Sequence, residues 1–501
     1  MSALSRREFG VATLTTLALL FSRTSSASSS STISFTTLSI VANLDPASDE
    51  FNLLNRISFG VTDQELNTIR ATGTSAYIEQ QLDPLSIDDS QLDATLSEYF
   101  PALALPISKL LKRDKKIPSQ LRYATAFRAA YSRRQLNEVM VDFWSNHFNI
   151  YQQGLTGFLK IIDDREVIRP HAMGYFKDLL FASAHSPAML LYLDNHKNTK
   201  QGGNENYARE LLELHTLGVD GGYTQEDVIQ VAYCLTGWTV AGKKSTHQGE
   251  FVFNSRRHKK GVKTVLGEAI HFPDDPIKEG ERVLEILANH PATARFISKK
   301  LCRRFVSDTP SNTLIEHIAS VFIQTGGYIP DLLRAIFNSS EFRQSADQKI
   351  RRPFELMSSF IRSLQISPYK NLIQKMNGML TILDQVPFRR LSPDGYPDKA
   401  EDWINSNALI NRWNFAITAV NLKFKQKNMS RLISANTIEG IVDELVDRLL
   451  FRPLSNVDRE TIIAFAQNYA PQNKTLKAKQ KRNVTLRIST LLLASPYYQW
   501  R

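Results

Sequence analysis

Apolar residues recur at three- and four-residue spacing along most of the chain beyond Asp49, with polar residues between them. This spacing places the apolar side chains on one face of a helix, so the pattern predicts a mainly α fold, built as a large multi-helix domain. The predicted helices cover residues 135–151, 188–194, 204–217, 224–238, 291–306, 312–324, 331–342, 353–364, 441–451 and 476–493.

Residues that favour helix starts stand before several helical segments. Thr62 and Glu65 have the spacing of a capping box, in which each side chain bonds to the backbone of the other residue. Asn204 and Thr224 are placed to cap the helices that follow them, because their side-chain oxygens can accept from first-turn N–H groups. The sequence therefore predicts where these helices begin.

Two stretches depart from the helical period. Within 249–272, residues 251–253 and 263–266 look like short extended pieces around a basic loop, which predicts a small β-hairpin-like insertion. Residues 387–398 are rich in Pro, Gly and Asp and are predicted to be loop. We expect a main helical lobe over 49–345, which carries the candidate site, and a C-terminal helical lobe over 346–501. Whether these lobes are separate domains stays open.

The first residues have the composition of an export signal. Arg6 and Arg7 precede an uncharged apolar run over 11–21, and a Ser-rich stretch follows. This order predicts a cleaved twin-arginine signal peptide over 1–27 and a flexible Ser/Thr-rich lead-in over 28–48. The apolar run has about half the length of a bilayer-spanning helix, which argues against the alternative of a permanent anchor. We therefore expect an exported, periplasmic protein without a permanent membrane span.

The chain has two cysteines, Cys234 and Cys302, each within an apolar helical pattern. An exported protein could join them in a disulfide, but two buried thiols are the simpler interpretation. Because no Cys-x-x-Cys or Cys-x-x-Cys-His motif occurs, we expect neither an iron–sulfur cluster nor a c-type haem.

The formal net charge is +11, and basic residues cluster at 112–116, 256–260 and 474–487. Such clusters could contact an anionic envelope polymer or lipid headgroups, although a solvated surface explains each of them as well. Aromatic residues are not interleaved with the basic ones, so no nucleic-acid partner is expected.

All ten histidines lie between His147 and His317, so a polar site is expected in this middle third of the chain. In the predicted helix 135–151, His147 shares an apolar face with Phe143 and Trp144. A histidine in such surroundings is more often a hydrogen-bonded core residue than a metal ligand.

The segment 204–218 places Asn206, Glu210 and Glu213 on one stripe of a helix. Two carboxylates and an amide on one stripe could converge on a cation or on a proton-transfer site. The alternative is a solvated face on which Glu205 pairs with Arg209 one turn later. The spacing alone does not decide between them.

No His-Glu-x-x-His, Gly-x-Ser-x-Gly or phosphate-binding Gly loop occurs. A catalytic or metal site would have to be assembled from distant residues, and the candidates are His147, His171, Glu210 and Glu213. Asn206 and Arg209 would be supporting polar groups. A divalent metal is the cofactor that such a set of ligands would hold.

Several longer motifs occur in a fixed order along nearly the whole chain. They are Leu53-Leu54-Asn55-Arg56, Phe59-Gly60, Phe143-Trp144-x-Asn146-His147-Phe148, Ile168-Arg169-Pro170-His171-Ala172, residues 204–218, residues 224–238, Arg352-Pro353-Phe354-Glu355, and Gly395-Tyr396-Pro397 with Trp403 behind it. With these motifs the chain closely resembles the bacterial domain-of-unknown-function 1800 family. The resemblance implies an exported helical protein but no established reaction.

The resemblance also implies a partner, because such proteins are often encoded beside the unknown-function family 1501, which is similar to the alkaline phosphatase and sulfatase superfamily. The chain departs from the family at 258–259, where His258 is followed by Lys259 instead of an aspartate. Loss of that carboxylate argues against His258 as part of a metal or acid–base pair. An aromatic residue in similar proteins at the position of His215 favours packing over ligation there.

Two functional hypotheses follow. The first is a non-enzymatic assembly or binding protein that acts with the sulfatase-like neighbour or with an anionic envelope polymer. The second is a periplasmic metal- or carboxylate-dependent enzyme with a His/Glu site in the middle third of the chain.

Overall fold

The computed structural model describes residues 48–501 except 112–113, 115, 423–428 and 471–474. These residues form two compact units, which we call the central unit (78–342 and 386–397) and the terminal unit (48–77, 343–385 and 398–501). The predicted signal peptide (1–27) lies outside the described residues, as does nearly all of the lead-in. The sequence pattern grouped residues 49–77 with the N-terminal lobe, whereas the structure groups them with the C-terminal segments.

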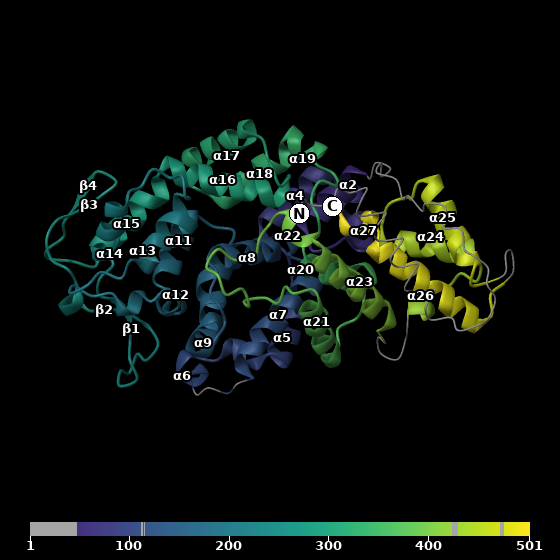
Figure 1. Cartoon of the computed structure of the whole chain (residues 1–501), viewed down its shortest axis with the longest axis horizontal. Helices are drawn as coiled ribbons and strands as arrows, with labels where there is room; N and C mark the ends of the chain where they lie inside the picture. Colours follow the sequence, from purple (N-terminus) through teal and green to yellow (C-terminus); the bar gives the residue numbers. More distant parts are fainter. Residues whose placement is uncertain (1–47, 112–113, 115, 423–428, 471–474) are drawn as a thin grey trace. The chain divides into compact units, whose positions relative to one another are not determined.

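The described residues are mainly helical, as the apolar period predicts (Figure 1). The helices and helical turns of the central unit are α5 (Ser90–Tyr99), α6 (Ile107–Leu110), α7 (Ile117–Tyr131), α8 (Gln135–His147), α9 (Gly154–Ile162), α10 (Arg169–His171), α11 (Phe176–Ala184), α12 (Pro187–Tyr192), α13 (Glu205–Glu210), α14 (Gln225–Cys234), α15 (Lys278–Asn289), α16 (Pro291–Phe305), α17 (Asn312–Thr325), α18 (Ile329–Asn338), η1 (Pro84–Ser86), η2 (Pro101–Ala104), η4 (Asn195–Lys197) and η6 (Ser255–Arg257), with π-helical segments η3 (Asp163–Ile168) and η5 (Leu211–Thr216). Its strands are β1 (Trp238–Val240), β2 (Phe251–Phe253), β3 (Lys263–Val265) and β4 (Glu268–Ile270).

The terminal unit is helical in its described residues. Its helices are α2 (Asp49–Ile57), α3 (Asp63–Thr72), α20 (Pro353–Ser363), α21 (Lys370–Ile382), α22 (Ala400–Trp403), α23 (Ser406–Asn421), η7 (Met429–Arg431), α24 (Ile438–Leu449), α25 (Asn456–Gln467), α26 (Ala478–Ala494) and α27 (Pro496–Gln499). Two of the boundaries between the units fall within α4 (Thr74–Leu82) and α19 (Ser340–Gln344), and the other two are at the ends of the segment 386–397.

The predicted helix starts are confirmed. Thr62 accepts from the backbone N–H of Glu65 at 3.3 Å, and its hydroxyl donates to the Glu65 carboxylate at 2.7 Å. Thr224 and Asp227 form a reciprocal capping box at the start of α14, and Asn204 caps α13. These bonds satisfy N–H groups that the first turn of a helix leaves without a helical partner.

The predicted extended segments are strands, but they belong to two separate hairpins. β2 pairs with β1, and β3 pairs with β4, both antiparallel. β1 occupies the end of the segment predicted as helix 224–238, because Gly237 turns the chain with φ +86°. A Cβ atom there would lie 2.6 Å from the carbonyl oxygen of Asn254.

Charged side chains lie within the core of the central unit. Lys160 is fully buried and donates to Asp163, the first residue of η3. Arg169 donates to Glu138 at 2.8 and 3.1 Å and to Asp164 at 2.8 Å. The two aspartates of the π-helical segment therefore each meet a cation from a neighbouring helical turn. Buried charges require such partners, because water no longer solvates them.

The terminal unit contains several buried arginines around one carboxylate. Glu355 accepts from Arg501 at 3.0 Å and from Arg352 at 3.1 Å. Arg412 is buried and donates to the carbonyl oxygen of Arg351 at 2.8 Å. Burial lowers the pKa of Arg412 to about 9, so its charge depends on the acceptors around it.

The predicted loop before residue 398 is held against α8 within the central unit. The side chain of Asn146 donates to the carbonyl oxygen of Tyr396 and accepts from its N–H, both at 2.7 Å. Gly395 has φ +75°, and a Cβ atom there would lie 2.3 Å from the carbonyl oxygen of Asn146. Asn149 adds a bond to the carbonyl oxygen of Ser392 at 2.7 Å. The loop is therefore an ordered part of this unit.

Both cysteines are free and buried, which confirms the thiol interpretation. Among the described residues, no helix has the length and apolar character needed to cross a membrane.

The arginine cluster of the terminal unit generates a stability prediction. Glu355→Gln leaves two buried guanidinium groups without their carboxylate, and we expect it to lower the free energy of unfolding by about 3–5 kcal/mol. Glu401→Gln removes an exposed carboxylate of the same unit, which pairs with Lys399 at the surface, and should change it by less than about 1 kcal/mol. Urea denaturation measures the free energy of unfolding of both variants. Equal losses in the two variants would contradict the role of Glu355 as the partner of the buried arginines.

Candidate functional site

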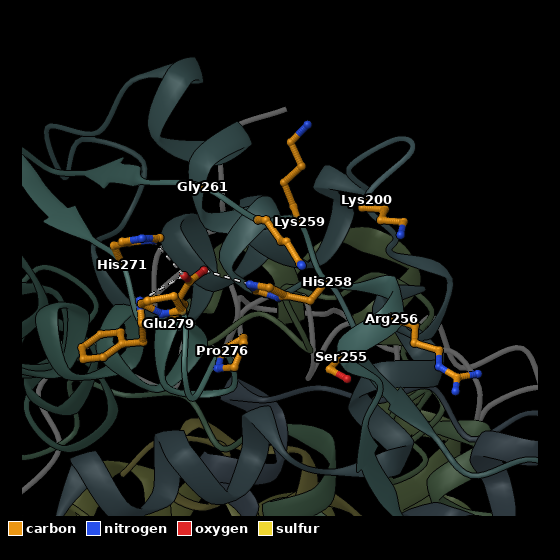
Figure 2. A pocket seen from close by; sticks show the side chains of 12 residues that line it. Lys200, Ser255, Arg256, His258, Lys259, Gly261, His271, Pro276 and Glu279 are labelled. Carbon is orange, nitrogen blue, oxygen red and sulfur yellow. Dashed lines mark hydrogen bonds and ion pairs between the residues drawn. The ribbon is translucent and has the colours of Figure 1, made fainter.

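The central unit contains a pocket of about 1020 Å³ beside the two hairpins (Figure 2). Its lining is unusually rich in cationic side chains. The lining residues are Lys200, Ser255, Arg256, His258, Lys259, Lys260, Gly261, His271, Phe272, Pro273, Pro276 and Glu279.

The chain forms this pocket by folding one continuous segment around the start of a helix. Lining residues 255–261 follow β2, and residues 271–276 follow β4. Glu279 lies in the first turn of α15. The backbone N–H of Lys200 donates to the carbonyl oxygen of Arg257 at 2.9 Å, which brings the earlier segment alongside.

Glu279 is the buried centre of the pocket floor. One of its oxygens lies 2.9 Å from His258 Nε2 and accepts from Lys263 Nζ. The other oxygen accepts from the backbone N–H of Phe272 at 3.2 Å and lies 4.0 Å from His271 Nδ1. Figure 2 shows His258 and His271 on either side of this carboxylate.

The ring of His258 is fixed from both sides. Its Nδ1 donates to the carbonyl oxygen of Thr236 at 2.8 Å, so Nδ1 carries a proton. Its Nε2 faces the Glu279 carboxylate and lies 3.3 Å from Lys263 Nζ. His258 is buried, so this ring belongs to the floor of the pocket.

Two opposing effects act on the pKa of Glu279. Burial raises it, because water no longer solvates the carboxylate, but hydrogen bonds from His258, Lys263 and the Phe272 N–H outweigh burial. The net pKa of Glu279 is therefore below its ordinary value of 4.5, and the group is a carboxylate at neutral pH.

His258 has a carboxylate partner in the structure, although residue 259 is a lysine and not an aspartate. The sequence argued against an ion-pair role for His258, because Lys259 stands where the family has aspartate. Glu279, 21 residues away from His258, provides that partner across the pocket floor.

The rim of the pocket is strongly cationic. Lys200, Arg256, Lys259 and Lys260 are exposed, and His271 stands opposite them on an exposed loop. Among the described lining residues, Glu279 is the one carboxylate, and the buried Lys263 already balances its charge. The arrangement attracts anions, because no acidic side chain of the described lining is left to neutralise the charges of the rim cations.

His147, a predicted site residue, is a core residue in the structure. Its Nδ1 lies 2.7 Å from Lys300 Nζ, and its Nε2 lies 3.1 Å from the carbonyl oxygen of His215. Burial, followed by the charge of Lys300, holds the pKa of His147 well below its ordinary value. Both ring nitrogens are thus occupied within the protein. Burial likewise lowers the pKa of His215 to about 3, as expected for a packed residue.

Several of the other predicted residues have partners of their own. His171 is half-buried, and its Nδ1 donates to the carbonyl oxygen of Val167 at 2.7 Å. Arg209 pairs with Glu205 at 2.9 Å, as the solvated-face alternative expects. The side chain of Asn206 donates to a backbone carbonyl at 3.1 Å.

Glu210 and Glu213 do lie near each other. Burial raises the pKa of Glu210 above its ordinary value, and the charge of Glu213 adds to this rise. The carboxylate of Asp394, in the loop held by Asn146, acts in the same direction. Among the described residues, however, no group of three or more His, Cys, Asp or Glu side chains is placed to hold a metal ion.

Comparison with known proteins gives one match. The sequence model of a family described as "Protein of unknown function (DUF1800)" matches residues 52–500. The chain belongs to this DUF1800 family. Neither a curated protein nor a solved structure matches it.

The motifs that identify this DUF1800 chain are largely occupied by internal bonds. Arg169 binds Glu138, Glu355 binds Arg352, and Asn146 binds the backbone of the 386–397 loop. Such buried networks fix how helices meet, which is the structural role that polar motif residues often have.

Several pocket residues of the DUF1800 chain escaped prediction. The sequence signalled the basic cluster 256–260, singled out His258 and predicted an extended piece over 263–266, but it did not assign Glu279, Lys263 or His271 to a site. Their positions depend on the pairing of β3 with β4 and on the start of α15. A buried Lys–Glu–His group of this kind has no characteristic spacing along the chain.

The floor of the pocket generates a pH-dependent prediction. We expect Glu279→Gln to lower the free energy of unfolding at pH 7 by about 3–5 kcal/mol, because it leaves buried Lys263 and His258 without their carboxylate. Because the folded pKa of Glu279 is lowered, its contribution is present above the ordinary value of 4.5 and is lost as the pH falls through the folded pKa. Urea denaturation at pH 7 and at successively lower pH values below 4.5 measures the difference.

The matched control is Glu285→Gln on the same helix. Glu285 is 40% exposed and pairs at the surface with Lys177 and Arg282. Its replacement should cost less than about 1 kcal/mol at every pH. A loss in Glu279→Gln that does not shrink in acid would contradict the ion-pair assignment.

Proposed function

We propose that this chain is an exported binding protein whose basic pocket holds anionic groups of an envelope polymer. The observation that carries the proposal is the charge distribution of the pocket. Four exposed cations, Lys200, Arg256, Lys259 and Lys260, border a cavity in which Glu279, the one carboxylate among the described lining residues, is neutralised by a buried lysine. Carboxylate, sulfate and phosphate groups are the ligands that such a rim attracts.

The rigidity of the floor supports binding as the role of the pocket. His258 is held by Thr236 on one side and by Glu279 on the other, so its ring nitrogens already have partners. A preorganised cationic surface loses little conformational entropy when a ligand arrives. In contrast, Glu210 and Glu213 offer a carboxylate pair. The alternative of a periplasmic metal- or carboxylate-dependent enzyme with a His/Glu site in the middle third of the chain stays a prediction.

Export is the second part of the proposal. It is supported by the Arg6–Arg7 pair and by the apolar run after it, which lie outside the described residues. A periplasmic location would place the basic pocket among the anionic polymers of the cell envelope. A sulfatase-like partner of family 1501 rests on the family resemblance alone and stays a prediction.

Binding is tested with polyphosphate as the anionic probe, by titration calorimetry at low and high salt. We expect a Lys259→Ala, Lys260→Ala double variant to bind about 30-fold more weakly, since each rim lysine near an anionic surface contributes about 1 kcal/mol. Salt should weaken binding of the unaltered protein, because exposed charges are screened. The control is Lys243→Ala, Lys244→Ala, two exposed lysines of the β1–β2 loop outside the lining. Equal affinities of the two double variants would refute the pocket as the binding site.

Export is tested with an Arg6→Lys, Arg7→Lys double variant. Because the export machinery reads the arginine pair, we expect the variant to accumulate as precursor in the cytoplasm, while the unaltered protein reaches the periplasm. Immunoblots of the two cell fractions measure this. Normal export of the variant would contradict the twin-arginine assignment.

A further inference from the structure

The pocket has an apolar side as well as a cationic one. Phe272, Pro273 and Pro276 line it together with the rim cations. Phe272 is 36% exposed, although a phenylalanine ring gains free energy when water is removed from it. A ligand that bound only through its charge would make no contact with this apolar side of the pocket.

The apolar side and the cationic side are joined through Glu279. One carboxylate oxygen accepts from the backbone N–H of Phe272, and the other faces His258 and accepts from Lys263. Pro273 and Pro276 restrict the backbone on the other side of Phe272. The backbone position of Phe272 relative to the buried Lys263 and His258 is therefore set before any ligand binds.

Two of the rim residues have contacts that position them. Lys259 Nζ lies 5.4 Å from the centre of the Tyr233 ring, in a cation–π contact. The backbone N–H of Lys200 donates to the carbonyl oxygen of Arg257 at 2.9 Å. The pocket volume of about 1020 Å³ lies at the upper end of the range of about 300–1000 Å³ that is typical of sites for organic ligands. The space exceeds what a single inorganic anion needs.

We infer that the pocket binds a saccharide that carries acidic groups. A sugar ring has one face made of C–H groups, which fits against an aromatic ring, and hydroxyl groups that accept from lysine and arginine. Carboxylate or sulfate substituents on such a sugar would meet the rim cations. This inference rests on the proposed anion binding and names the class of ligand.

The lining argues against a nucleic acid. Single-stranded nucleic acids are bound by several aromatic residues that stack successive bases, and the described lining residues include one aromatic side chain besides the two histidines. Base edges are often bound by Asn and Gln amides and by Ser and Thr hydroxyls, in addition to Arg and Lys. Among the described lining side chains, Ser255 is the one neutral hydroxyl or amide.

The test uses the exported protein and compares polygalacturonate, an acidic polysaccharide, with polyphosphate, which has no sugar. We expect Phe272→Ala to weaken polygalacturonate binding about fivefold, the effect of losing one aromatic contact, and to change polyphosphate binding less than about twofold. Phe272→Tyr keeps the ring and should bind polygalacturonate like the unaltered protein. Val262→Ala is the matched control, because Val262 is an exposed apolar residue of the same basic loop outside the lining.

The outcomes separate this inference from the proposed function. Equal polygalacturonate affinity of Phe272→Ala and the unaltered protein would overturn the saccharide assignment. The assignment would also be overturned if single-stranded DNA bound and if Phe272→Ala weakened that binding more than it weakened polygalacturonate binding. Equal weakening of polyphosphate binding by Phe272→Ala would also overturn it, since the ring would then act through pocket shape. If polyphosphate binding does not depend on Lys259 and Lys260, the proposed anion binding itself fails. Unchanged thermal unfolding of each variant shows that the fold is intact.

Discussion

A charge that leaves water must meet an opposite charge or a set of hydrogen bonds, and this requirement organises both units of the chain. In the terminal unit, Glu355 joins Arg352 and Arg501. In the central unit, Glu279 joins Lys263 and the ring of His258. Each carboxylate connects segments that are distant in sequence, so the packing of the surrounding helices and hairpins depends on it.

The motifs that identify the family and the residues that form the pocket are largely different sets. Motif residues such as Arg169 and Asn146 are bonded to other parts of the protein and hold helices and a loop in place. The pocket is formed mostly by the segment 255–279, with Thr236 behind its floor. The family motifs therefore describe the scaffold, and the pocket lies in the hairpin region.

The pocket combines features that are separately unremarkable. Exposed lysines occur on most protein surfaces, and an exposed phenylalanine by itself needs no explanation. Here both border one cavity, and the backbone of Phe272 is bonded to the same carboxylate that binds the buried lysine. The histidine and carboxylate candidates at 147, 171, 210 and 213 have other surroundings. His147 is sealed in the core, and Glu210 and Glu213 are two half-buried acids without a third ligand placed for a metal among the described residues.

The sequence by itself determined the mainly α fold, the capped helix starts at Thr62, Asn204 and Thr224, and the presence of extended segments near 251 and 263. These features depend on bonds between residues about four positions apart, or on a periodic pattern within one segment, so they can be read locally. Only the tertiary structure decided that His258 meets Glu279, 21 residues away, and that Asn146 binds Tyr396, 250 residues away. It also decided that the two predicted strands pair with different partners. A contact between distant residues leaves no periodic trace in the sequence, because the path of the chain between them sets whether they meet.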